Sequence, residues 1–184
     1  MARSIARTKE TRVVSQQVAL ERILDDESAT DAFAKHLAAA LTPGIVIGLI
    51  GDLGAGKTRL VRSCAIALGA DPERINSPTF VLIQEYSARI PLFHFDTYRL
   101  RSPIDFPDLG PEEYFRPDAI CFVEWADRVL EWLPEDLLRI ELEILGPQRR
   151  RLRLHTDGPT ARQVLARLRR TDPPRSAASH GGSK

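Results

Sequence analysis

Residues 51–58 contain the feature that most restricts how this chain can fold. Their sequence, Gly51-Asp52-Leu53-Gly54-Ala55-Gly56-Lys57-Thr58, has the form G-x-x-x-x-G-K-[ST] of a phosphate-binding P-loop. An apolar run of strand length, residues 44–50, comes before it, and a helical pattern comes after it. A phosphate-binding P-loop requires a strand before it and a helix after it. Because both are present, the segment indicates a phosphate-binding loop and not merely a Gly-rich turn that connects two elements.

The residue types in this segment suit a nucleoside triphosphate. Glycines let the backbone approach phosphate oxygens and adopt positive φ angles. The loop amides and the positive end of the following helix form a site for anions. We expect Lys57 to lie exposed at the junction of loop and helix, where its charge reaches the outer phosphates, and the Thr58 hydroxyl to be a ligand of Mg²⁺.

Composition sets broad limits on the rest of the molecule. The chain has 184 residues, 43% of them hydrophobic, which favours one globular domain with a sizeable core. Its net charge is +1, so its overall charge does not indicate electrostatic binding to nucleic acid or membranes. We predict a flexible extension over residues 1–13, a P-loop ATPase domain over 14–170 and a disordered tail over 171–184. Cys64 and Cys121 lie in apolar patterns and are expected in the core. With no secretory signal or membrane span predicted, we expect a cytoplasmic protein.

The order of the predicted elements indicates an α/β fold with a mixed sheet. Residues 28–31 resemble a capping box at the start of a helix that reaches Leu41. A weak strand is predicted over 18–24, hairpins over 79–95 and 138–156, a buried strand over 119–124, a short helix over 127–133 and a terminal helix over 159–170. We expect the P-loop strand at the centre of the sheet and antiparallel strands added by both hairpins.

Two acids follow apolar strands, as a P-loop ATPase requires for its metal and its attacking water. Glu124 ends the run 119–123, and Asp96 follows Leu92-Phe93-His94-Phe95. Ligands bind at the carboxyl edge of such sheets, so both are candidate catalytic residues. Either could instead be an ordinary surface carboxylate at the end of a strand.

Four blocks occur in order along the chain. They are the P-loop, Ser77-Pro78-Thr79-Phe80, His94-Phe95-Asp96-Thr97-Tyr98-Arg99 and Val123-Glu124-Trp125. Together they resemble the TsaE (YjeE) family, over roughly residues 18 to 156. The resemblance implies a single P-loop domain that binds MgATP and acts with TsaB and TsaD, which install threonylcarbamoyladenosine next to the anticodon of tRNA. Contact with tRNA would be indirect.

The resemblance also implies roles for individual residues. Lys57 and Thr58 would hold phosphate and Mg²⁺, Glu124 would be the Walker-B-type acid and second metal residue, and Asp96 would lie in the catalytic or metal site. Ser77-Pro78-Thr79 would form a switch-like loop facing the γ-phosphate. The predicted nucleotide-binding residues are Asp52, Leu53, Gly54, Ala55, Gly56, Lys57, Thr58, Arg59 and, beside the adenine, Thr30.

Alternatives remain open at this point. The chain could be a small P-loop kinase of a metabolite, although the acidic, Pro-rich segment 100–117 is unlike a kinase lid, or a nucleotide-dependent binding module with negligible turnover. His94 and Tyr98 could simply face one side of a strand, and Trp125 could serve packing or recognition. Arg99 could sense phosphate or be a surface charge. The run Arg149-Arg150-Arg151, with Arg153, could contact RNA or a base or be a solvated charge run.

Overall fold

The computed structural model describes residues 17–75 and 82–171. In this part of the chain, one seven-stranded sheet has the order β1-β7-β6-β2-β5-β4-β3. The strands are β1 (Leu20–Leu24), β2 (Val46–Ile50), β3 (Ile83–Tyr86), β4 (Leu92–Asp96), β5 (Ile120–Glu124), β6 (Leu137–Ile144) and β7 (Arg150–Asp157). The longer helices are α1 (Glu27–Ala40), α2 (Lys57–Ala67) and α3 (Pro159–Thr171).

The sheet is mixed in the way the sequence predicts. The P-loop strand β2 is the fourth strand of seven and pairs in parallel with β5 on one side and β6 on the other. Strand β4 extends this parallel core, because it pairs with β5 in register. Antiparallel partners then close both sides, with β3 on β4 and β7 on β6, followed by β1. The α/β fold class, the central P-loop strand and both hairpins are confirmed.

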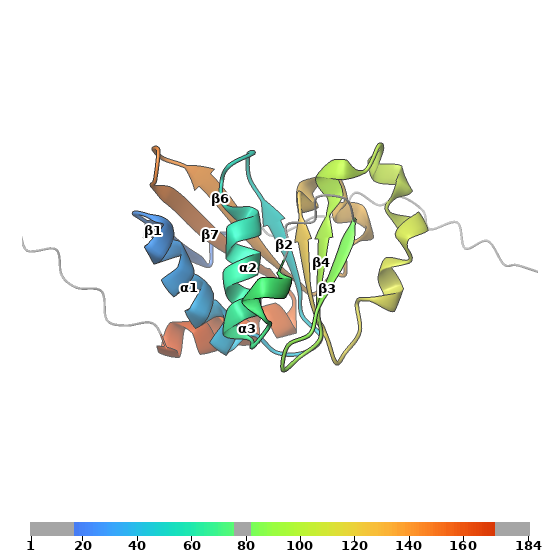
Figure 1. Ribbon diagram of the computed structural model, residues 1–184, viewed down its shortest axis with the longest axis horizontal. Coiled ribbons are helices and arrows are strands. Elements are labelled where there is room, and N and C mark those ends of the chain that lie inside the picture. Colours follow the sequence, from blue (N-terminus) through green and yellow to red (C-terminus); the bar gives the residue numbers. More distant parts are fainter. Residues whose placement is uncertain (1–16, 76–81, 172–184) are drawn as a thin grey trace, which may run out of the picture.

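Side-chain alternation divides the core between the two faces of the sheet. Ile120 and Phe122 of β5 pack with α1, α2 and α3 in one cluster, while Cys121 and Val123 belong to the cluster on the other face. Figure 1 shows α1 and α2 side by side over the first face. Since Glu124 continues the alternation of Ile120 and Phe122, its side chain points toward the face that carries α2.

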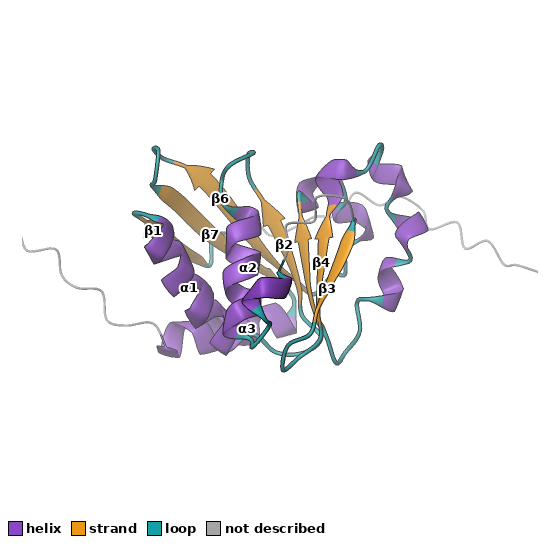
Figure 2. Cartoon of the chain, viewed as in Figure 1, coloured by secondary structure: helices purple, strands orange, loops and turns teal. Residues whose placement is uncertain are grey.

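Short 3₁₀ turns cover the second face. They are η2 (Thr97–Arg99), η3 (Pro103–Asp105), η4 (Pro107–Leu109), η5 (Pro111–Glu113), η6 (Ala126–Arg128) and η7 (Leu130–Trp132), and η1 (Pro72–Arg74) follows α2. Figure 2 shows η3 to η5 as a curved path beyond the β3 edge of the sheet. The region 103–117 therefore contains the predicted short helices, but the single helix predicted over 127–133 is wrong. Two turns replace it, because the backbone of Val129, with a φ of −124° and a ψ of 17°, interrupts the helical conformation between them.

The start of α1 also differs from the prediction. Asp26, not Ser28, is the N-cap residue, and its Oδ1 accepts a 2.7 Å hydrogen bond from the Ala29 amide. The helix consequently begins at Glu27, and the predicted capping box over 28–31 is inside its first turn. Asp and Ser are both good N-caps, so sequence preference alone does not separate the two positions.

Several predictions concern residues outside the described part of the chain. These are the flexible extension 1–13, the switch-like loop Ser77-Pro78-Thr79 and the tail beyond Thr171, with which α3 ends. The domain limits at 14 and 170 stay predictions. Both cysteines are buried, as expected. Across the described ranges, no helix has the length and apolar character needed to cross a membrane.

Candidate nucleotide-binding and catalytic site

The P-loop joins β2 to α2 through three glycines with positive φ. Gly51 has a φ of 145°, and a Cβ there would lie 2.3 Å from the Leu142 carbonyl oxygen, so no side chain fits. Gly54 and Gly56, with φ of 80° and 101°, instead face open space. Gly56 is the N-cap of α2 and, as a glycine, makes no side-chain cap hydrogen bond to the first amides of the helix. An open turn followed by uncapped helix amides is an arrangement that suits an anion.

The other loop residues divide into an outer and an inner set. Asp52 and Leu53 form the exposed outer turn, and Leu53 is 74% exposed. Ala55 is buried, and its amide donates to the Asp52 carbonyl at 3.1 Å. This local hydrogen bond closes the turn and leaves Asp52 and Leu53 exposed at the edge of the sheet. Gly54 and Gly56 instead line a pocket beside the loop.

Lys57 is buried, contrary to the exposed position expected from the sequence. Its Nζ donates to the carbonyl oxygens of Gly51 at 2.6 Å and Asp52 at 2.9 Å. The same atom lies 3.6 Å from the centre of the Trp125 ring, in a cation–π contact. Burial lowers the pKa of Lys57, and the carboxylates led by Glu124 partly offset that shift. The amino group is therefore held beneath the loop, where it donates hydrogen bonds to two loop carbonyls and packs against the Trp125 ring.

Thr58 and Glu124 meet at the start of α2. The Thr58 hydroxyl donates to Glu124 Oε2 at 2.9 Å. The other carboxylate oxygen, Oε1, lies 2.8 Å from His94 Nε2, and His94 Nδ1 lies 3.1 Å from the Tyr86 hydroxyl. Parallel register explains the arrangement, because His94 stands opposite Phe122 and so reaches Glu124 two residues further along β5.

Asp96 lies beside Glu124 in the register of β4 and β5. One of its oxygens accepts from the Tyr98 amide at 3.1 Å and caps η2, and the other accepts from Arg99 Nε at 3.3 Å. The two candidate acids therefore reach the same edge of the sheet with different surroundings. Glu124 is buried among side chains, and Asp96 faces a turn at the surface.

Trp125 has a φ of 57°, the only positive φ of a non-glycine residue in the described ranges. An L-residue in this conformation costs about 1–2 kcal/mol, which neighbouring contacts must offset. The Thr97 hydroxyl donates to the carbonyls of both Glu124 and Trp125, at 2.8 and 3.0 Å. The Tyr98 ring lies 4.8 Å from the Trp125 ring, and Arg128 donates to the carbonyls of Thr97 and Tyr98. These bonds tie η2 to the residues that follow Glu124.

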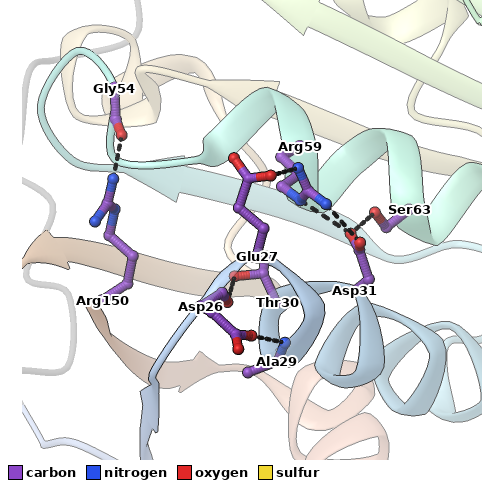
Figure 3. A network of polar contacts seen from close by, with 9 residues as sticks. All are labelled: Asp26, Glu27, Ala29, Thr30, Asp31, Gly54, Arg59, Ser63 and Arg150. Atoms are coloured by element: carbon purple, nitrogen blue, oxygen red, sulfur yellow. Dashed lines mark hydrogen bonds and ion pairs between the residues drawn. The ribbon is translucent and has the colours of Figure 1, made fainter. Parts of the chain in front are cut away.

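A pocket of about 520 Å³ opens beside the P-loop. Its walls come from the start of α1, the loop itself and the β6–β7 turn, including Thr30, Gly54, Ala55, Gly56, Gln148 and Arg150. Arg150 Nη2 donates to the Gly54 carbonyl at 3.1 Å, as Figure 3 shows. The structure thus brings Thr30, predicted to lie beside the adenine, to the same hollow as the P-loop.

Arg59, another predicted nucleotide-binding residue, lines this pocket but points its guanidinium at α1 (Figure 3). It bonds Asp31 at 3.1 and 2.6 Å and Glu27 at 2.5 Å. Ser63 donates to Asp31 as well, at 2.6 Å. The bond from Arg59 keeps the pKa of Asp31 below its usual range. Arg59 thus links α2 to α1 through its ion pairs with Asp31 and Glu27.

The residues present suit Mg²⁺ held together with a triphosphate. Thr58 and Glu124 offer a hydroxyl and a carboxylate oxygen, which are the hard ligands that Mg²⁺ prefers. No group of three or more His, Cys, Asp or Glu side chains in the described ranges could hold a metal alone. A cation here would therefore draw its remaining ligands from phosphate and water, as Mg²⁺ usually does.

The sequence does not predict the contacts of Arg150, Tyr86 and Arg128. Arg150 was part of a basic run, but the other members pair with acids: Arg149 with Asp25, and Arg151 and Arg153 with Glu143 and Glu21. Those three match a solvated charge run, while Arg150 donates to the P-loop.

The His94 side chain is fully buried and hydrogen-bonded on both ring nitrogens, which the periodicity of the strand does not indicate.

Comparison with known proteins identifies the fold and its relatives. The model of the family described as "Threonylcarbamoyl adenosine biosynthesis protein TsaE" matches residues 24–152. The tRNA threonylcarbamoyladenosine biosynthesis protein TsaE of Bacillus subtilis (strain 168) is 40% identical over 144 residues, covering 78% of this chain and 89% of that protein. Its counterpart in Treponema pallidum (strain Nichols) is 42% identical over 112 residues, covering 61% and 82%. The crystal structure of Bacillus subtilis YdiB superposes with a TM-score of 0.71 at 35% identity, covering 85% of this chain and 98% of that one.

Proposed function

The chain belongs to the TsaE family, and from this premise we propose that it binds and hydrolyses MgATP in support of tRNA threonylcarbamoyladenosine formation. The observation that carries the proposal is the meeting of Thr58 and Glu124 at 2.9 Å, directly beside an open P-loop. A P-loop hydroxyl next to a strand-end acid is the arrangement by which such ATPases hold the metal of MgATP.

Each site residue has a distinct task in this proposal. The amides of the P-loop and the start of α2 bind the phosphates, and the Lys57 ammonium adds a charge beside them. Thr58 and Glu124 hold the metal, which when bound neutralises charge on the phosphate oxygens. Asp96, at the same sheet edge, orients the attacking water. Thr30 lines the pocket in which the nucleoside would lie.

We further propose that TsaB and TsaD are the partners, and that the protein works with them in the cytoplasm without binding tRNA directly. The family resemblance supports this choice. The structure adds that Leu53, in the P-loop, and Tyr98, in η2, are 74% and 54% exposed at the carboxyl edge of the sheet. Large apolar and aromatic side chains exposed beside a nucleotide site suit a protein contact that responds to ATP.

Phosphate release tests the proposal. We expect slow release from ATP and Mg²⁺ by the protein alone, and faster release when TsaB and TsaD are added. A Lys57→Ala variant should abolish both, and Lys35→Ala, at an exposed site on α1, should change neither. A phosphorylated small molecule in place of free phosphate would support a metabolite kinase. Nucleotide binding without turnover, even with the partners present, would indicate a binding module and contradict the ATPase proposal.

A further inference from the structure

A row of four side chains connects the core of the sheet to the start of α2. Tyr86 on β3, His94 on β4, Glu124 on β5 and Thr58 on α2 are joined by contacts of 3.1, 2.8 and 2.9 Å. Tyr86, His94 and Glu124 are 3%, 0% and 3% exposed. Such complete burial leaves each polar atom in the row dependent on its neighbour for a hydrogen bond.

The two hydrogen-bond partners of His94 decide which imidazole nitrogen carries the proton. A neutral histidine has one N–H and one acceptor nitrogen, and an ionised carboxylate only accepts. For a neutral His94 beside an ionised Glu124, Nε2 carries the proton, since two acceptors would otherwise face each other at 2.8 Å. Nδ1 is then an acceptor and needs a donor, which the Tyr86 hydroxyl supplies at 3.1 Å. Burial raises the pKa of Tyr86 to about 12, so that hydroxyl keeps its proton.

We propose that Tyr86 and His94 are positioning residues that fix the Glu124 carboxylate for the metal of MgATP. Tyr86 selects the tautomer of His94, His94 Nε2–H holds Oε1, and Oε2 is left directed at Thr58. The role rests on the proposed function, because it assigns Glu124 to the metal. Beyond that function, two core residues, one of them on the edge strand β3, set the orientation of the acid.

Variants of His94 separate this role from simple packing. His94→Gln keeps an N–H donor that can reach Glu124, whereas His94→Leu fills the space without one. Loss of an outer-shell partner of a metal ligand typically weakens metal binding by about 10–100-fold. We therefore expect His94→Leu to reduce the Mg²⁺-dependent gain in ATP affinity by about tenfold or more, and His94→Gln to restore most of it.

Tyr86→Phe tests the outer member of the row. It removes only the hydroxyl, and the ring stays in the core. Tyr114→Phe is the matched control, because the Tyr114 ring packs on Phe93 and Phe95 in the opposite cluster. We expect Tyr86→Phe to lower the Mg²⁺-dependent gain and Tyr114→Phe to leave it unchanged, with thermal unfolding confirming that every variant is folded.

Nitrogen NMR of the full-length protein, labelled with ¹⁵N-histidine, provides the second readout. The signals of His94, assigned by their loss in His94→Gln, should show a protonated Nε2 and an unprotonated Nδ1, and Tyr86→Phe should alter them. A protonated Nδ1 in the wild-type protein would overturn the proposal. So would Mg²⁺ dependence in His94→Leu and Tyr86→Phe equal to that of the wild type. If the wild-type protein itself shows no Mg²⁺-dependent ATP binding, the proposed function fails and this role fails with it.

Discussion

The Thr58 hydroxyl donates to Glu124 Oε2 at 2.9 Å, although 66 positions separate the two residues in the sequence. The contact depends on the pairing of β2 with β5, which sets Leu49 opposite Glu124 and so brings the acid to the point where the P-loop begins. A metal held by these two residues would take the place of this hydrogen bond. The structure thus presents the acid and the hydroxyl already close together.

The first prediction concerns that hydroxyl. Thr58→Ala should reduce ATP affinity in Mg²⁺ by about tenfold, a loss of about 1.4 kcal/mol, because the variant lacks one of the oxygen ligands proposed to hold the metal. Affinity in EDTA should change little. Thr58→Ser keeps the hydroxyl and should behave as the wild type. Calorimetric titration with and without Mg²⁺ measures all three, and an equal loss in both buffers would contradict a metal role for Thr58.

The second prediction separates the two acids. Glu124→Gln should lose most of the Mg²⁺ dependence of ATP binding, because Glu124 bonds Thr58 directly. Asp96→Asn should keep binding and lose turnover, because the Asp96 carboxylate accepts hydrogen bonds from the Tyr98 amide and Arg99 and is proposed to orient water, not to hold the metal. Binding isotherms and single-turnover phosphate release distinguish these outcomes. Parental hydrolysis rates in both variants would place neither acid in the site.

Trp125 should report nucleotide binding by fluorescence. Its ring lies 3.6 Å from Lys57 Nζ, whereas the other tryptophan, Trp132, contacts Phe106 in the cluster on the opposite face. Phosphate near Lys57 changes the charge beside the Trp125 ring. ATP should therefore change the emission of a Trp132→Phe variant and leave that of Trp125→Phe unaffected. A response from Trp132 alone would show that the nucleotide does not approach Lys57.

The N-cap of α1 gives a stability prediction with an internal control. Asp26→Ala removes the bond to the Ala29 amide and should cost about 1 kcal/mol, the usual value of a good N-cap. That loss corresponds to a fall in Tm of about 2–4 °C for a domain of this size. Ser28→Ala, within the first turn, should change Tm by less. Calorimetry of both variants tests the assignment, and a larger effect from Ser28→Ala would contradict it.

The sequence predicts the fold well because its signals are local and strong. The P-loop, the apolar strands and the hairpins define a mixed sheet with β2 at its centre, and the two acids lie at the ends of their strands. What the sequence did not predict depends on tertiary contacts. Lys57 lies against the ring of Trp125, whose left-handed backbone is a conformation that an L-residue rarely adopts. The link from Tyr86 through His94 to Glu124 requires the register of three strands, and spacing along the chain does not reveal it.

The central claim is that ATP binding at this P-loop supports formation of threonylcarbamoyladenosine in tRNA. Its most direct test is nucleoside mass spectrometry of tRNA from cells depleted of the protein and rescued with wild-type, Lys57→Ala or Lys35→Ala chains. Depletion should lower the modified nucleoside in tRNAs that read codons beginning with A. The wild-type and Lys35→Ala chains should restore it, and Lys57→Ala should not. A normal level after depletion, or full rescue by Lys57→Ala, would contradict the claim.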